Sequence, residues 1–255
     1  MSGTTNVNDI LKQLDTLNET TGVDVYIPSL KSSVKFKNLN LKQQKELLKS
    51  SVDESLTKLA FIINFYNIIQ DNIIDKINVN SFYTFDRIAI ALSLRANGLD
   101  SNLTLGDTII DLNDLINKVS AVHVDGNTLS TTVEIDNFAV ELEVPHLNVD
   151  RDVSQVTINK LKNLQSNDIK TLVGELFVHE IIKFVKTVTF KSETIDQAVS
   201  FSSIKVEDRL AIIEKFPSTL TSKILEFVKT YRDFESQFTT VGDNNIEIDG
   251  SFFSV

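Results

Sequence analysis

The sequence predicts an α+β fold: an N-terminal β-hairpin followed by helices, a small central antiparallel sheet, and a helical C-terminal region that ends in a strand. Apolar residues alternate in 23–36 and 133–144, as in strands with one buried face. They recur every three or four residues in 41–97 and 206–238, as in helices that pack on a core. With 255 residues, 42% of them apolar, the chain can form one large domain or two small ones.

The first 22 residues are polar and rich in Thr and Asn. Ile10, Leu11, Leu14 and Leu17 are spaced by three or four, which predicts one or two helical turns with a docking stripe. We expect residues 1–22 to form an arm that is frayed or docked on a partner.

Residues 23–100 open with the hairpin. Two alternating runs, Val23–Ile27 and Val34–Phe36, are joined by Pro28–Ser33, and Asn38 or Asn40 can cap a helix that begins near Leu41. A two-stranded unit is marginal alone. We therefore expect other strands to complete it, either from 246–253 of this chain or from a neighbour's edge.

Two further helices are expected before residue 100. The first, over 53–74, is apolar on most sides and should be the central core helix of this half. The second, over 82–97, should stop at a left-handed Asn97-Gly98 pair. It carries Arg87 and Arg95, whose favoured interpretation is solvated charges or intrachain pairs rather than contacts to an acidic partner.

Residues 101–153 form an acidic, β-rich region with 2 basic and 10 acidic side chains, which accounts for −8 of the net charge of −10. Strands are predicted at 121–124 and 133–144, separated by a turn at 125–127. Acidic residues occupy much of the register opposite the apolar one, giving a sheet with a negative face: Glu134, Asp136, Glu141 and Glu143. This charge argues against nucleic-acid binding.

The negative face has two interpretations. A calcium site would use clustered carboxylates, but Asp107, Asp111 and Asp114 lack the spacing of an EF-hand loop. A solvated face, or one that meets a basic partner, is the favoured interpretation.

Residues 154–255 are predicted to be helical, with helices at 158–164, 169–188 and 206–215. Pro217 should end the last of these, and Ser218 should cap the next helix. That helix bears a heptad-type stripe, which is either a core face or a seam with another subunit: Leu220, Ile224, Phe227, Tyr231, Phe234 and Phe238. The flanking Leu225 and Val228 favour the core face. A final strand over 245–253 should expose Phe252 and Phe253.

No catalytic, cofactor or metal site is predicted. The chain has no cysteine, and its eight glycines are scattered singly, so thiolate metal sites and glycine-rich phosphate loops are absent. Glu175 and His179 share a helical face, but Lys183 occupies the position where a zinc protease needs its second histidine. We also expect no membrane span and no signal peptide.

The hairpin-helix segment resembles the start of the baseplate hub proteins of T-even-type contractile-tailed bacteriophages. In that family an Ile-Pro-Ser strand precedes a second strand, a short leader and a helix with a Gln-Gln-Lys run that ends in Leu-Leu-Lys. The matching residues here are Ile27, Pro28, Ser29, Leu30, Val34, Phe36, Leu39, Gln43, Gln44, Lys45, Leu47, Leu48 and Lys49. The resemblance is clearest over about 23–75, and the order of elements around Glu214–Ser218 is compatible with it.

The resemblance implies a structural tail protein of the baseplate hub that works by protein–protein contact. Its partners would be other tail and baseplate proteins, with the tape-measure protein as a candidate, and it would reside in the virion after assembly in the host cytoplasm. An assembly chaperone absent from the virion is the alternative, and a hub-associated hydrolase that uses Glu175 and His179 is a third hypothesis. We expect the contact surface to include Ile27, Pro28, Leu30, Phe36, Leu220, Ile224, Phe227, Tyr231, Phe234, Phe252 and Phe253.

Overall fold

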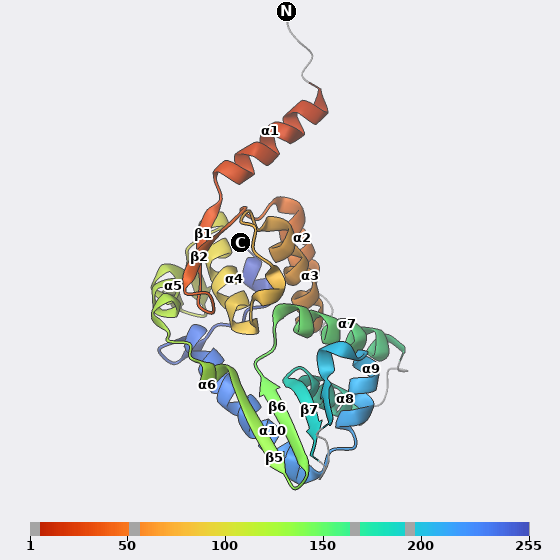
Figure 1. Cartoon of the computed structure of the whole chain (residues 1–255). Coiled ribbons are helices and arrows are strands. Elements are labelled where there is room, and N and C mark those ends of the chain that lie inside the picture. Colours follow the sequence, from red (N-terminus) through yellow and green to blue (C-terminus); the bar gives the residue numbers. More distant parts are fainter. Residues whose placement is uncertain (1–5, 51–56, 164–168, 192–196, 255) are drawn as a thin grey trace, which may run out of the picture.

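The structure, a computed structural model, describes residues 6–50, 57–163, 169–191 and 197–254 (Figure 1). Its α-helices are α1 (Val7–Thr20), α2 (Leu41–Ser50), α3 (Thr57–Asn72), α4 (Thr84–Gly98), α5 (Leu112–Ala121), α6 (Gly126–Leu129), α7 (Leu147–Asn163), α8 (Ile169–Ile182), α9 (Val206–Ile213) and α10 (Ser218–Glu235). Its strands are β1 (Val23–Ile27), β2 (Ser32–Phe36), β3 (Asn102–Leu105), β4 (Thr108–Asp111), β5 (Ser130–Ile135), β6 (Phe138–Glu143), β7 (Val185–Phe190), β8 (Gln197–Ser200), β9 (Thr240–Val241) and β10 (Asn244–Asn245). The fold is α+β, as predicted, with small antiparallel sheets.

The predicted N-terminal hairpin and the helix after it are confirmed. β1 pairs with β2 in antiparallel register, Val25 opposite Val34, and α2 begins at Leu41. Asn40 caps α2 as expected: its side chain accepts from the Gln43 amide at 3.0 Å, and the Gln43 side chain accepts from the Asn40 amide at 3.1 Å. This reciprocal pair satisfies two amides that the helix start leaves unpaired.

The expectation that residues 246–253 complete the hairpin is wrong, and its completion by a neighbour's edge stays a prediction. β1 and β2 form a two-stranded sheet by themselves, extended only by an isolated bridge between Phe36 and Ile73. Helix α4 packs on the hairpin instead. Val25, Ile27, Val34 and Phe36 are fully buried. A helix therefore provides the apolar cover that a small sheet needs.

Helices α3 and α4 match the helices predicted over 53–74 and 82–97. Residues 53–56 of the first prediction lie outside the described part of the chain. Phe65 and Ile69 of α3 are fully buried, as expected of a core helix. The left-handed stop after α4 is wrong. Neither Asn97 nor Gly98 has a positive φ, which among the described glycines occurs at Gly106 and Gly242, and Leu99 follows α4 with a φ of −127°.

The central sheet is larger than the sequence predicts. β5, β6, β7 and β8 form a four-stranded antiparallel sheet in that order. The expected region boundary at 153 falls inside α7, and the sheet takes strands from both sides of it. The acidic region and the C-terminal region therefore share one sheet.

Two local predictions fail around this sheet. Residues 121–124 form no strand, because Ala121 ends α5 and Val122 is its cap. The helix expected over 169–188 ends at Ile182, and 185–190 is strand β7, which pairs with β6. Alternating β-branched residues, Val185, Thr187 and Thr189 among them, favour a strand once β6 offers an unpaired edge.

The final strand predicted over 245–253 is also wrong. Strand pairing ends at Asn245, and Ser251–Phe253 forms one turn of 3-10 helix. Phe252 and Phe253 are buried rather than exposed. The helix restart after Pro217 is confirmed, but Ser218 lies inside α10 and no side-chain hydrogen bond caps the helix.

Helix α1 is longer than the expected one or two turns. It projects from the rest of the molecule at the opposite end from the β5–β6 hairpin (Figure 1). Its base is tied down by Glu19, 2.9 Å from the Lys37 ammonium, and by the Thr21 carbonyl, which accepts from the Asn38 amide group at 2.8 Å. Most of the apolar side chains of α1 are exposed, and whether the arm frays or docks on a partner stays a prediction.

Candidate functional site

The predicted contact residues of the hairpin lie mostly inside this chain's own core. Ile27, Pro28 and Phe36 are buried, and Leu30 in the turn is 36% exposed. Only Leu30 of this group is placed to meet another protein without a change in the fold.

The stripe on α10 is a core face, which is the interpretation that the sequence favoured. Leu220, Ile224 and Tyr231 are buried, while Phe227 and Phe234 are half-buried. Their rings pack on rings from the remainder of the chain: Phe184–Phe227 at 6.1 Å between centroids, Phe184–Tyr231 at 5.5 Å, and Phe85–Phe234 at 5.5 Å. A seam with another subunit would need these side chains on the surface.

The C-terminal aromatics are held beneath α3 and α4. The Phe253 ring lies 5.4 Å from the Phe65 ring, and the Arg95 guanidinium lies 5.2 Å from the centre of the Phe252 ring. Arg95, only 6% exposed, also donates hydrogen bonds to the Phe252 and Ser254 carbonyls. Arg95 therefore has intrachain partners, as expected, and it fixes the end of the described chain.

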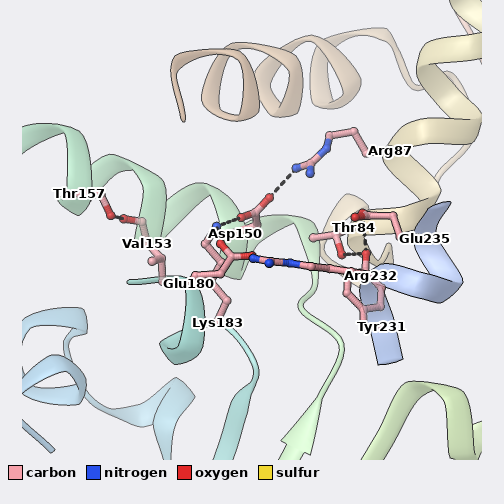
Figure 2. A network of polar contacts seen from close by, with 10 residues as sticks. All are labelled: Thr84, Arg87, Asp150, Val153, Thr157, Glu180, Lys183, Tyr231, Arg232 and Glu235. Atoms are coloured by element: carbon pink, nitrogen blue, oxygen red, sulfur yellow. Dashed lines mark hydrogen bonds and ion pairs between the residues drawn. The ribbon is translucent and has the colours of Figure 1, made fainter. Parts of the chain in front are cut away.

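A set of charges, buried at its centre and open to solvent at one end, lies where α4, α7, α8 and α10 meet (Figure 2). We call it the charged cluster, and its members are Arg87, Asp150, Glu180, Lys183 and Arg232. Asp150 of α7 is at its centre. One of its oxygens lies 2.5 Å from Arg87 and the other lies 2.8 Å from Lys183. The side chains of Asp150 and Lys183 are only 3% and 8% exposed.

Glu180 continues the charged cluster towards the surface. Its carboxylate lies 3.0 Å from Lys183 and 3.4 Å from Arg232, whose side chain is mostly exposed. A second chain of hydrogen bonds runs alongside, from Thr84 to the Tyr231 hydroxyl at 2.6 Å and from that hydroxyl to Glu235 at 2.8 Å (Figure 2). Together these contacts connect the N-terminal and C-terminal halves of the chain.

The charged cluster holds its members ionised. Burial raises the pKa of Asp150, but the adjacent Lys183 and Arg87 outweigh it, so the pKa lies below its ordinary value. Burial lowers the pKa of Lys183, but Asp150 and Glu180 outweigh it, so the pKa lies above its ordinary value. Burial likewise raises the pKa of Glu180, and Lys183 brings it below the usual range. None of these three side chains therefore changes its protonation state near neutral pH.

Two adjoining cavities open beside the charged cluster, with volumes of about 610 Å³ and about 470 Å³. Lys58, Lys183 and Arg232 line both of them. The larger cavity has an apolar side between α8 and α10, where large side chains are exposed; we call it the α8–α10 groove, and its exposed members are Val173, Phe177 and Leu225. No sequence motif predicts this groove, although the residues of α8 are apolar on several sides of the helix, which indicates more than one contact surface.

The acidic residues of the sheet meet basic residues of this chain. Lys186 of β7 lies 3.1 Å from Glu141 and 3.3 Å from Glu143 of β6. Lys191 lies 2.8 Å from Glu134 of β5. These intrachain pairs offset part of the negative charge of the sheet, and a contact between this face and a basic partner stays a prediction.

The three histidines lie on different parts of the chain. His179 is buried on α8, the side chain of Glu175 lies outside what the structure describes, and Lys183 is part of the charged cluster. His146 stacks on Tyr83, with 4.2 Å between ring centroids. Within residues 6–50, 57–163, 169–191 and 197–254, no group of three or more His, Asp or Glu side chains is arranged to hold a metal ion.

The fold and site define an α+β protein whose two halves are joined through buried charges. Comparison with protein-family models, with curated proteins and with solved structures gives no match. Among the described helices, none has both the length and the apolar character that crossing a membrane requires.

Proposed function

We propose that this chain is a non-enzymatic structural component of a phage tail baseplate, in the hub region, and that it acts through protein–protein contacts. The observation that carries the proposal is the apolar stripe of α1: Ile10, Leu11, Leu14 and Leu17 are each about half exposed on a helix that projects from the molecule. Exposed apolar faces of this kind mark sites of protein contact.

The resemblance to hub proteins supplies the setting. Its residues lie in one structural unit, the β1–β2 hairpin and α2. Within that unit Ser29 and Gln43 make specific contacts to Asp86 and Asn72. The residues that match the family therefore hold the hairpin and α2 against α3 and α4. This is consistent with a structural role in an assembly.

The charged cluster supports contact rather than catalysis. Its carboxylates stay ionised and its lysine stays protonated, so it offers neither a general acid nor a general base at neutral pH. In the proposed setting, the partners of this protein are other tail and baseplate proteins, with the tape-measure protein as a candidate. The protein would meet them after its synthesis in the host cytoplasm.

Quantitative mass spectrometry of purified virions tests the proposal. A baseplate component is expected at a fixed copy number per particle and is expected to remain with isolated baseplates. A phage with this gene deleted should yield no complete tails, and the intact chain supplied from a plasmid should restore them. Complete, infectious particles without the chain would overturn the proposal.

The α8–α10 groove favours an assembly chaperone as the second candidate. An amphipathic helix of a client protein would place its apolar face against Val173, Phe177 and Leu225, with the nearby Lys58 and Arg232 able to meet acidic residues at its edge. The same experiment separates the two candidates, because a chaperone is required for tails yet absent from purified virions.

A further inference from the structure

Strand β1 has one edge that pairs with β2 and one edge that pairs with no described strand. The backbone groups on the unpaired edge can be deduced from Lys35 of β2, which lies opposite Asp24 in the register. The Lys35 amide donates to the Asp75 carboxylate at 2.7 Å, and the Lys35 carbonyl accepts from the Ile74 amide at 2.9 Å. Both groups therefore point away from β1, and Asp24 and Lys35 share no backbone hydrogen bond.

The hydrogen-bonding groups of β1 consequently alternate between its two sides. Val25, opposite Val34, directs its amide and carbonyl to β2, whereas Asp24 and Tyr26 direct theirs to the unpaired edge. Within the part of the chain that the structure describes, no hydrogen bond reaches the backbone amide or carbonyl of Asp24 or Tyr26. The outer edge of β2, in contrast, is bonded to residues 72–75. We call the side of β1 that carries these four unbonded groups the open edge.

The open edge belongs to a strand that is already ordered within the chain. Helix α4 covers one face of β1, and Val25 and Ile27 are fully buried. The turn after β1 is held to α4 by two hydrogen bonds from Ser29 to Asp86. Because the strand is ordered in advance, it loses little conformational entropy when a partner pairs with it.

The backbone groups and the charge of the open edge define the partner that fits it. Donors and acceptors that recur every second residue along a strand match another extended segment, whereas a helix bonds its own backbone groups internally. Asp24 is exposed and takes part in none of the ion pairs of the described chain. A basic side chain directly across the new strand pair would therefore be stabilising.

We propose that the open edge of β1 binds an extended segment of a partner protein, which adds an antiparallel strand to the hairpin. This segment has Lys or Arg opposite Asp24, an apolar residue opposite Val25, and no proline at the positions opposite Asp24 and Tyr26. The inference makes specific the expectation that a neighbour's strand completes the hairpin. It concerns a different surface from α1 and does not depend on the proposed function.

The probe for the test is the synthetic peptide Ac-Val-Thr-Val-Lys-Val-NH2. In antiparallel register its central Val lies opposite Val25 and its Lys lies opposite Asp24. Amide hydrogen exchange in the isotope-labelled full chain is followed by NMR, with and without the peptide. In the free chain we expect fast exchange at Asp24 and Tyr26 and slow exchange at Val25. Saturating peptide should slow the exchange at Asp24 and Tyr26 by at least about tenfold.

Two controls separate strand pairing from other contacts. The same peptide with N-methyl groups on its Thr and Lys keeps its side chains but cannot donate to the open edge, so it should protect neither amide. Asp24→Lys, a substitution of an exposed side chain, should weaken binding of the probe by about threefold to tenfold, and a peptide with Asp in place of Lys should restore it.

Three results would overturn the proposal. The first is unchanged exchange at Asp24 and Tyr26 in saturating peptide, and the second is equal protection by the N-methylated peptide. The third is protection of these two amides that rises with the concentration of the chain alone, because that would assign the open edge to β1 of a second copy.

Discussion

The Ser29 hydroxyl donates a 2.6 Å hydrogen bond to the Asp86 carboxylate, and the Ser29 amide donates a second one at 3.0 Å. Asp86 also accepts from the Tyr83 amide at 2.8 Å, near the start of α4. One fully buried carboxylate therefore fastens the turn of the β1–β2 hairpin to the helix that covers it. This contact gives the serine of the Ile-Pro-Ser segment a physical role within the fold.

Replacing Asp86 should change how stability depends on pH. Burial raises the pKa of Asp86 to about 6 from an ordinary 3.8, although the bonds from Ser29 and Tyr83 act to lower it. A raised carboxyl pKa gives stability that is complete below the unfolded value and lost as pH rises through the folded value. At about 1.36 kcal/mol per pKa unit the full effect is roughly 3 kcal/mol, of which roughly 2 kcal/mol is lost between pH 4 and pH 6.5.

Urea unfolding of the native chain and Asp86→Asn at several pH values measures this effect. The difference in free energy of unfolding between the two should shift against the native chain as pH rises over that interval. Ser29→Ala should cost about 1.5–3 kcal/mol at pH 7, where the carboxylate is charged, and less at pH 4. A pH-independent difference between native and Asp86→Asn chains would show that Asp86 does not titrate here.

The charged cluster should fail when its central carboxylate is neutralised. Asp150→Asn leaves Arg87 without its ion-pair partner, and it leaves Lys183 with Glu180 alone. Breaking a buried pair in this way costs about 3–5 kcal/mol. Because the pKa of Asp150 is depressed, its stabilising contribution in the native chain is present above the ordinary pKa of 3.8 and is lost as pH falls further.

A matched control lies two positions along. Asp152 pairs with Arg151 at 2.6 Å, but both side chains are substantially exposed, so Asp152→Asn should cost less than about 1 kcal/mol. Chemical denaturation at pH 7 compares the two variants. Equal losses of unfolding free energy in the two variants would mean that burial does not strengthen the stabilisation by the ion pairs of the charged cluster.

The C-terminal segment should undock if Gly250 gains a side chain. A Cβ at Gly250 would overlap the Leu47 carbonyl oxygen of α2, which is backbone and cannot move aside cheaply. Gly250→Ala should therefore expose the Phe252 and Phe253 rings and destabilise the fold by about 2–4 kcal/mol, as overpacking and lost aromatic burial combine. Limited proteolysis near the C-terminus and thermal unfolding report on this. Gly126→Ala, where a Cβ meets nothing within 4 Å, is the control and should unfold like the native chain.

The Tyr231 hydroxyl should stabilise the fold through its two hydrogen bonds, to Thr84 and to Glu235. Tyr231→Phe keeps the ring against Phe184 but removes the bonds to Thr84 and Glu235. Since Thr84 is buried and loses a partner, the expected cost is about 1–3 kcal/mol. Burial raises the pKa of Tyr231 well above 10, so this contribution should stay constant between pH 6 and pH 9. A stability equal to that of the native chain would assign the contribution of Tyr231 to its ring alone.

Features that depend on neighbouring residues were predictable from the sequence. The alternation in 23–36 gives the hairpin, Asn40 and Gln43 cap the next helix, and the stripe from Leu220 to Phe238 gives a core-facing helix. Each of these rests on backbone geometry and side-chain periodicity within a few turns or strand positions, which the sequence specifies directly.

Features that depend on pairing between distant segments were decided by the tertiary structure. The run Val185–Phe190 is a strand because β6 offers it an edge, and 245–253 is not a strand because Phe252 and Phe253 gain more by burial under α3 and α4. The partners of Arg87 and Ser29, Asp150 and Asp86, lie 63 and 57 residues away in the sequence. Many carboxylates of this acidic chain could have served those two groups. Packing of the helices selects which of them is buried within hydrogen-bonding distance, and no local pattern records that choice.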